Sequence, residues 1–180
     1  FESVSIAEPM LGEVGSDATV INADKEAVAK AITAAAVSEA GFESLEAAKD
    51  AGTAFVFMGH GTAHVAKVTY SQMQTQMQNL GYENVFIGTV EGEPEETSAE
   101  AVIEAVKAAG YTNVVLRPLM VVAGDHANND MAGSDDDSWK TLFEAAGFTV
   151  DCQIHGLGEI ADVQALYVAH TKAAIDALNA

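Results

Sequence analysis

Residues 112–139, TNVVLRPLMVVAGDHANNDMAGSDDDSW, decide the fold of this chain. The stretch begins with the apolar, β-branched run Val114–Leu116, which predicts a buried strand, and Pro118 interrupts the pairing of that strand. Gly124–His126 then opens a loop rich in Asn, Asp, Gly and Ser. In α/β proteins, working residues lie beyond the carboxyl ends of buried strands. His126 is therefore the first candidate for a functional residue.

The rest of the chain repeats one pattern after residue 52. Short apolar runs bounded by glycines predict strands, and longer segments with apolar residues every three to four positions predict helices. The expected strands cover residues 54–58, 84–90 and 148–153 in addition to 114–116, and the expected helices cover residues 65–80, 98–109, 137–146 and 160–178. This alternation with short connections predicts an α/β fold with a four-stranded parallel sheet flanked by helices.

The first 50 residues do not complete a second domain. Residues 3–6 alternate in polarity and predict a short strand, residues 25–40 predict a helix, and residues 45–51 predict a short helical piece. We expect this part to be cut from a larger unit. The chain has no initiator Met and no signal-peptide pattern, so we expect the true N-terminus to be missing. The cytoplasm is the default compartment, and the periplasm is the alternative if a signal has been lost.

Composition excludes several classes of partner and site. The 180 residues carry 27 acidic and 8 basic side chains, a formal net charge of −19. Nucleic acids and anionic membranes attract basic surfaces, so this charge argues against both. No apolar run reaches the roughly 20 residues that a membrane-spanning helix needs. The single cysteine, Cys152, excludes an internal disulfide and a metal site built from several cysteines.

Polar residues follow two further strands. His60 comes directly after the first apolar run, and Glu91 and Glu93 come directly after the second. Because the carboxyl ends of parallel strands meet at one edge of a sheet, we expect these side chains to lie near His126. Two imidazoles and a carboxylate form a three-ligand set suitable for a divalent first-row metal ion. The same groups can act as general bases near neutral pH.

Each candidate also has a purely structural interpretation. His60 could cap the helix that follows it, and Glu91 and Glu93 could be solvated turn residues. Asp125 is better explained as a brace of its own loop. His155 is better explained as a structural residue, because it follows a strand end without an acidic neighbour. The residues alone leave the alternatives for His60 and the glutamates open.

Three motifs in order make the chain resemble one enzyme family. They are FVFMGHGT at residues 55–62, GTVEGEP at residues 88–94, and RPLMVVAGDHANNDMAG followed by DDSWK within residues 117–140. Together they resemble the anaerobic cobalt chelatases, the sirohydrochlorin cobaltochelatases of the class II chelatase superfamily, which are related to ferrochelatase. The resemblance covers residues 50–180 well and residues 1–50 loosely, and it implies a chelatase-like fold.

The resemblance implies a lyase that inserts Co²⁺ into a tetrapyrrole, sirohydrochlorin or precorrin-2, during anaerobic cobalamin biosynthesis. In this family the histidines of MGHG and AGDH hold the metal ion and take part in proton removal, and these positions are His60 and His126 here. A glutamate after the second strand joins the metal site. That position matches Glu91, although Glu93 is only two residues away.

The resemblance further places the tetrapyrrole beside Gly59, Gly61 and Met120. The two glycines would let the macrocycle approach the backbone closely. Because the substrate carries many carboxylates, which an acidic chain repels, we expect Arg117, Lys67 or backbone N–H groups to offset this repulsion locally.

Family members have two similar α/β domains with the tetrapyrrole bound between them. The resemblance therefore implies that residues 1–50 are a remnant of an N-terminal chelatase domain, its last strand and crossing helix, and that residues 51–180 form the C-terminal chelatase domain. A homo-oligomer is also compatible with the sequence. Because such a site selects poorly among divalent ions, Fe²⁺, Ni²⁺ and Zn²⁺ are alternative metals. The rival functions are a ferrochelatase or nickel chelatase on the same scaffold, and a metal or haem carrier without turnover.

Overall fold

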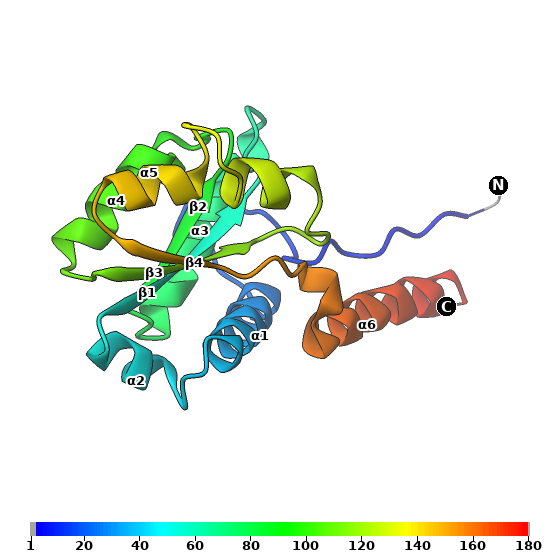
Figure 1. The fold of residues 1–180 in the computed structure, drawn as a ribbon. Coiled ribbons are helices and arrows are strands. Elements are labelled where there is room, and N and C mark those ends of the chain that lie inside the picture. Colours follow the sequence, from blue (N-terminus) through cyan, green and yellow to red (C-terminus); the bar gives the residue numbers. More distant parts are fainter. Residues whose placement is uncertain (1–2, 180) are drawn as a thin grey trace.

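The computed structural model describes residues 3–179, in which a parallel sheet has helices on both faces (Figure 1). The strands are β1 (Thr53–Gly59), β2 (Val85–Thr89), β3 (Asn113–Pro118) and β4 (Thr149–Cys152). Their order in the sheet is β2-β1-β3-β4, and every neighbouring pair is parallel. The predicted α/β fold with a four-stranded parallel sheet is therefore confirmed.

The helices follow the predicted segments closely. They are α1 (Ala23–Glu39), α2 (Leu45–Asp50), α3 (Val68–Asn79), α4 (Ala99–Ala108), α5 (Trp139–Ala145) and α6 (Ala161–Leu178), with a π-helical turn at Ala127–Met131 and 3-10 turns at Val65–Lys67, Glu95–Thr97 and Leu157–Glu159. The side chains of Asn22, Ser44, Ser98 and Ser138 each accept a hydrogen bond from the backbone N–H three residues on, which satisfies a donor of the first helical turn. None of the helices within residues 3–179 is long and apolar enough to cross a membrane.

Alternate side chains of the central strand pack on opposite faces of the sheet. On one face, Phe55 and Phe57 pack with apolar residues of α1 and α3. On the other face, Val56 and Met58 pack with apolar residues of α4 and α5. All of β1 is buried, as expected for the interior strand of a parallel sheet that is covered on both sides.

Helix α1 shares its core with the sheet. Val28, Ile32 and Ala36 on one side of α1 are at most 1% exposed and pack in the same cluster as Phe55 and Phe57. The helix predicted in this part of the chain is therefore confirmed, and it covers one face of the sheet (Figure 1).

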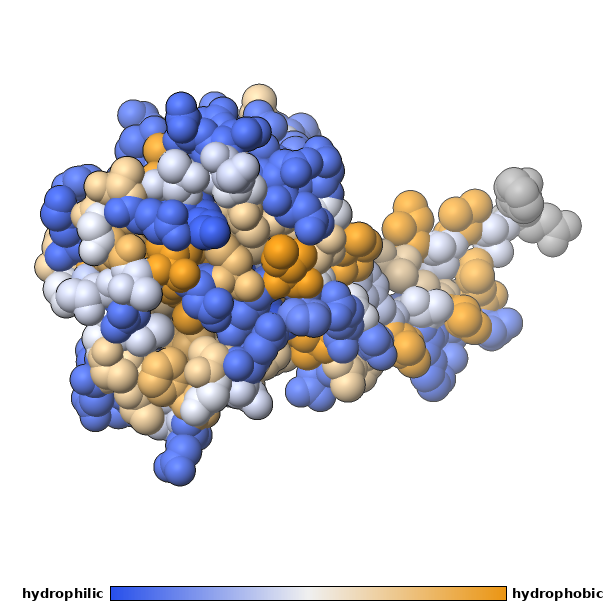
Figure 2. All heavy atoms as spheres, viewed as in Figure 1, coloured by the Kyte–Doolittle hydropathy of each residue, from blue (hydrophilic) through white to orange (hydrophobic). Residues whose placement is uncertain are grey.

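The strand predicted at residues 3–6 is wrong. Residues 3–9 have no regular secondary structure, and Val4 and Ile6 are 74% and 87% exposed. Alternating polarity yields a strand only where a neighbouring strand satisfies the backbone N–H and C=O groups, and this segment has no such neighbour in the sheet of residues 3–179. Instead the segment runs outward beside α6, and apolar residues are scattered over this projecting part (Figures 1 and 2).

Candidate metal site

The strand order brings two loops together at the carboxyl edge of the sheet. From β1 the chain moves outward to β2, whereas from β3 it moves in the opposite direction to β4. The carboxyl ends of β1 and β3 are neighbours, so they form the point where the direction of the chain switches. Open α/β sheets bind ligands in the crevice at this point. His60 directly follows β1, and His126 lies in the loop after β3.

The two histidines from these separate strand ends lie against each other. The centroids of the His60 and His126 imidazole rings are 4.7 Å apart, and the ring planes are inclined at 85°, an edge-to-face arrangement. Both side chains are accessible, and that of His126 is 38% exposed. The expected proximity of the two imidazoles is therefore present, and their roles as metal ligands and proton acceptors stay predictions.

Each imidazole uses its Nδ1 atom in a local hydrogen bond. Nδ1 of His60 lies 2.8 Å from the carbonyl oxygen of Gly61, and Nδ1 of His126 lies 2.5 Å from Oδ2 of Asp130. A carbonyl and an ionised carboxylate can only accept, so both Nδ1 atoms donate a proton. In the neutral rings, Nε2 is therefore the nitrogen with a free lone pair.

Glu91 lies beside His60 at the end of the neighbouring strand. The backbone N–H of Glu91 donates to the carbonyl oxygen of His60 at 2.9 Å, which continues the pairing of β1 and β2. A cavity of about 590 Å³ opens here and is lined by His60, Gly61, Thr62, Ala63, Glu91 and Glu93. The carboxylate of Glu93 is 2.5 Å from Nζ of Lys67, whereas Glu91 is exposed at the cavity. This difference favours Glu91 as the available carboxylate.

The complete three-ligand set is not assembled. Within residues 3–179, no three or more His, Cys, Asp or Glu side chains are grouped so that they could hold a metal ion. The structure therefore brings the two histidines together and places Glu91 at the same edge, and the contribution of Glu91 to metal binding stays a prediction.

The predicted tetrapyrrole-contacting residues have different surroundings. Gly59 is buried, and a Cβ atom there would lie 2.4 Å from Cε1 of Tyr70, whose hydroxyl oxygen accepts from the N–H of Gly61 at 3.1 Å. Sequence reasoning missed Tyr70, because a tyrosine within a helix carries no signal that distinguishes packing from a site. Gly61 lines the cavity, and Met120 is partly buried against the core beyond β3.

Two expectations about charged residues need correction. Arg117 is only 4% exposed and binds Glu39 at 2.5 Å and the side-chain oxygen of Gln153 at 2.9 Å, so it is not available to a substrate carboxylate. His155 does have acidic neighbours, since its Nδ1 lies 2.8 Å from Glu159 and its Nε2 lies 3.4 Å from Glu39. Glu159 is only four residues away in the sequence, whereas the contact with Glu39 depends on α1, which the local sequence around residue 155 does not reveal.

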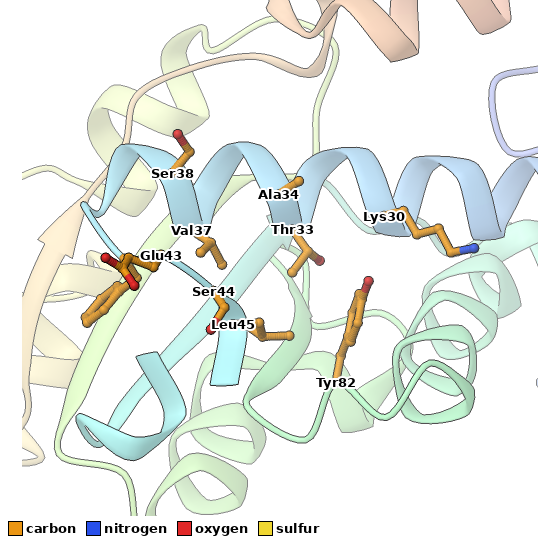
Figure 3. A pocket seen from close by; sticks show the side chains of 10 residues that line it. Lys30, Thr33, Ala34, Val37, Ser38, Glu43, Ser44, Leu45 and Tyr82 are labelled. Atoms are coloured by element: carbon orange, nitrogen blue, oxygen red, sulfur yellow. The ribbon is translucent and has the colours of Figure 1, made fainter. Parts of the chain in front are cut away.

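Two other cavities differ from the histidine site in chemistry or place. One of about 670 Å³ adjoins the site and has an acidic lining that includes Glu91, Glu100, Asp130, Asp136 and Asp137. The other, of about 370 Å³, lies between α1, the loop that follows it and Tyr82 (Figure 3). Tyr82 precedes β2, so this second cavity lies at the amino ends of the strands, away from the histidines.

Comparison with protein families matches residues 1–176 to the family described as cobalt chelatase (CbiK). The chain belongs to this family. A sirohydrochlorin cobaltochelatase of Salmonella typhimurium is 42% identical over 121 residues, which are 67% of this chain and 44% of the relative. Sirohydrochlorin cobaltochelatase CbiKC of Nitratidesulfovibrio vulgaris is 33% identical over 135 residues, which are 75% of this chain and 46% of the relative. The chain thus spans about half the length of the curated relatives it matches.

Proposed function

We propose that the chain inserts Co²⁺ into sirohydrochlorin, with His60 and His126 holding the ion before transfer and accepting the pyrrole protons. The observation that carries this proposal is the contact of the two imidazoles at the switch point of the sheet. Membership of the cobalt chelatase family, and the reaction named for both relatives, support the same substrate pair. Co²⁺ is a substrate of this reaction.

Imidazoles suit both halves of the chemistry. Insertion removes two N–H protons from the tetrapyrrole and delivers a partly dehydrated cation. A neutral imidazole can bind a first-row ion through a nitrogen lone pair, and it can accept a proton near pH 7. Because Nδ1 is engaged in His60 and in His126, Nε2 would serve for either step. A site with few protein ligands keeps coordination positions open for the incoming pyrrole nitrogens.

The carboxylate and the cation at the cavity would have complementary roles. We propose that one face of the macrocycle lies against the cavity beside Gly61. There Glu91 would lower the net charge of the arriving ion. Lys67, which is half-exposed and paired with Glu93, is the remaining candidate to meet a substrate carboxylate. Gly59 and Met120 would act by shaping the floor beneath the macrocycle.

We also propose the division into a remnant of an N-terminal chelatase domain over residues 1–50 and a C-terminal chelatase domain over residues 51–180. The matches to less than half of each relative support this division. Because α1 packs into the core formed with the sheet, this helix would remain packed against the C-terminal domain of residues 51–180.

The proposal is tested by following the absorbance of sirohydrochlorin after Co²⁺ is added to the chain, with the Salmonella relative as a positive control. We expect His60→Ala and His126→Ala each to slow insertion by at least about 100-fold, the usual contribution of a positioned proton acceptor. His155→Ala is the matched control, because it removes an exposed histidine outside the site.

Two results would contradict the proposal. One is near-normal insertion by either alanine variant with an unchanged circular dichroism spectrum. The other is a wild-type chain without activity under conditions in which the Salmonella relative turns over. Parallel runs with Fe²⁺, Ni²⁺ and Zn²⁺ establish the metal preference, and bound metal without a metallated product identifies a carrier.

A further inference from the structure

We infer that Asp130 is a positioning residue, which fixes the ring orientation and the tautomer of His126 so that Nε2 faces the metal ion. The inference rests on the proposed function of the histidine pair. Asp130 lies four residues after His126, and its carboxylate contacts Nδ1 of the ring and not Nε2, the nitrogen proposed to bind the metal ion. The bond that carries the inference joins Nδ1 of His126 to Oδ2 of Asp130 at 2.5 Å.

The local backbone is built to make this bond. His126 stands immediately before the π-helical turn Ala127–Met131, and the N–H of Ala132 donates to the carbonyl oxygen of Ala127 at 3.3 Å across that turn. A π turn holds one residue more than an α turn, and such turns are rare and frequently occur at functional sites. Asp130 lies four residues after His126, a spacing that makes side chains neighbours on a helical turn, and its carboxylate meets the imidazole there.

The turn is anchored on one side and closed tightly at its end. Ala127 and Met131 are fully buried, and Met131 packs in the core with α4 and α5. The N–H of Gly133 donates to the carbonyl oxygen of Asn129 at 3.0 Å, and a Cβ atom on Gly133 would lie 2.3 Å from that oxygen. Only glycine permits this close approach, so the sequence itself supports the unusual turn.

Neighbouring groups show that the contact is selective. Asp125 lies in the same loop and carries the same charge, yet its carboxylate accepts from the side-chain amide of Asn129 at 2.6 Å and not from His126. His60, the other member of the pair, donates to a backbone carbonyl. Of the two imidazoles, only that of His126 thus has a carboxylate behind it.

A carboxylate behind a metal-binding histidine has a known physical effect. It holds the ring in one orientation and in the Nδ1–H tautomer, which leaves Nε2 free and makes the ring a stronger ligand. Loss of such a partner typically lowers metal affinity by about 10-fold to 100-fold. Asp130 would therefore let His126 hold the ion more firmly than His60 does.

The experiment measures Co²⁺ binding directly, by titrating the chain with Co²⁺ and recording the visible absorption of the bound ion. We expect Asp130→Ala to weaken binding by about 10-fold to 100-fold. The nearly isosteric Asp130→Asn should weaken it by roughly 3-fold to 10-fold, because a neutral acceptor replaces a charged one. Asp125→Asn, which removes the same charge from the same loop, should bind within about 2-fold of wild type.

A second readout reports the tautomer itself. Nitrogen-15 NMR of the metal-free chain, at a pH where the rings are neutral, should show His126 as the Nδ1–H tautomer in wild type and a shift toward Nε2–H in Asp130→Ala. A residue that only supported the fold would not move this signal. Should the alanine variant fail to fold, the Co²⁺ affinity of Asp130→Asn decides the question.

The outcomes separate this inference from the proposed function. Wild-type affinity in the folded Asp130 variants, or an unchanged tautomer in Asp130→Ala, with binding lost in His126→Ala, overturns the role of Asp130 and leaves the histidine pair in place. An equal loss in Asp125→Asn also overturns it, because charge alone would then explain the effect. Wild-type affinity in His126→Ala removes the proposed metal site as well.

Discussion

Substitution of Gly61 by alanine tests how the strand ends that carry the site fit together. Gly61 has a φ of +90°, and a Cβ atom there would lie 2.9 Å from Cβ of Glu91 and 3.1 Å from Cβ of Thr89. The left-handed backbone should cost about 1–2 kcal/mol for a residue with a Cβ. Forcing the added methyl into a packed contact should cost a further 1–3 kcal/mol or so. We therefore expect Gly61→Ala to lower the free energy of unfolding by about 2–5 kcal/mol.

A matched substitution separates the cost of the steric contact at Gly61 from the cost of the left-handed backbone. Gly81 has a φ of +74° with nothing within 4 Å of a Cβ atom, so Gly81→Ala carries only the backbone cost. Urea unfolding followed by the fluorescence of Trp139, which is 3% exposed in the core, gives the free energy for both variants. The difference between them should be about 1–3 kcal/mol. Equal destabilisation by the two substitutions would show that the two strand ends are not in tight contact at Gly61.

Three further predictions concern the Arg117–Glu39 pair and Cys152. In the same urea assay, Glu39→Gln should lower the free energy of unfolding by about 3 kcal/mol relative to wild type, because the 4% exposed guanidinium of Arg117 would lose its counter-charge. Arg117→Met should lower it less, because Glu39 can reach water. Equal losses in the two variants would contradict this reasoning. Burial raises the pKa of Cys152 from 9.0 to about 11, so its thiol should react with a disulfide reagent at pH 8 roughly 100-fold more slowly in the folded chain than in urea. Between pH 9 and 11 the unfolded thiol loses its proton while the folded one keeps it, so stability should fall as the pH rises, and Cys152→Ala should remove that part of the fall.

Hydrophobic periodicity and the residues that end helices and strands were sufficient to predict the four strands and the helices that cover them. The apolar periodicity of residues 98–109 predicts α4, which Ser98 caps, and the apolar run after residue 52 becomes the buried strand β1. The same reasoning failed at residues 3–6. A local alternation of polarity contains no information on whether a partner strand is present, and the exposed Val4 and Ile6 have none in the sheet.

The parts of the site that escaped prediction depend on contacts between distant segments or on an unusual turn. The sequence around His126 has the composition of a loop, so the π-helical turn that places Asp130 against it was not expected. The pairing of Arg117 with Glu39 requires α1 to cross the sheet, and no local pattern near Arg117 signals that it is buried. His60 and His126 could be predicted as candidate site residues from the sequence alone, because a histidine that follows a strand is recognisable from local sequence.

The order of the strands explains why His60, more than the other candidates, is central to the site. An alternating chain of strands and helices is compatible with the simple order β1-β2-β3-β4, in which β2 would separate β1 from β3 by about 9–10 Å. In the observed order, β1 lies between β2 and β3, at a spacing of roughly 4.8 Å from each. His60 is therefore one strand away from both Glu91 and His126, whereas these two are separated by the width of β1. This geometry accounts for the contact of the two imidazoles and for the backbone bond between His60 and Glu91. In the proposed metal site, His60 would therefore stand between the carboxylate of Glu91 and the imidazole of His126.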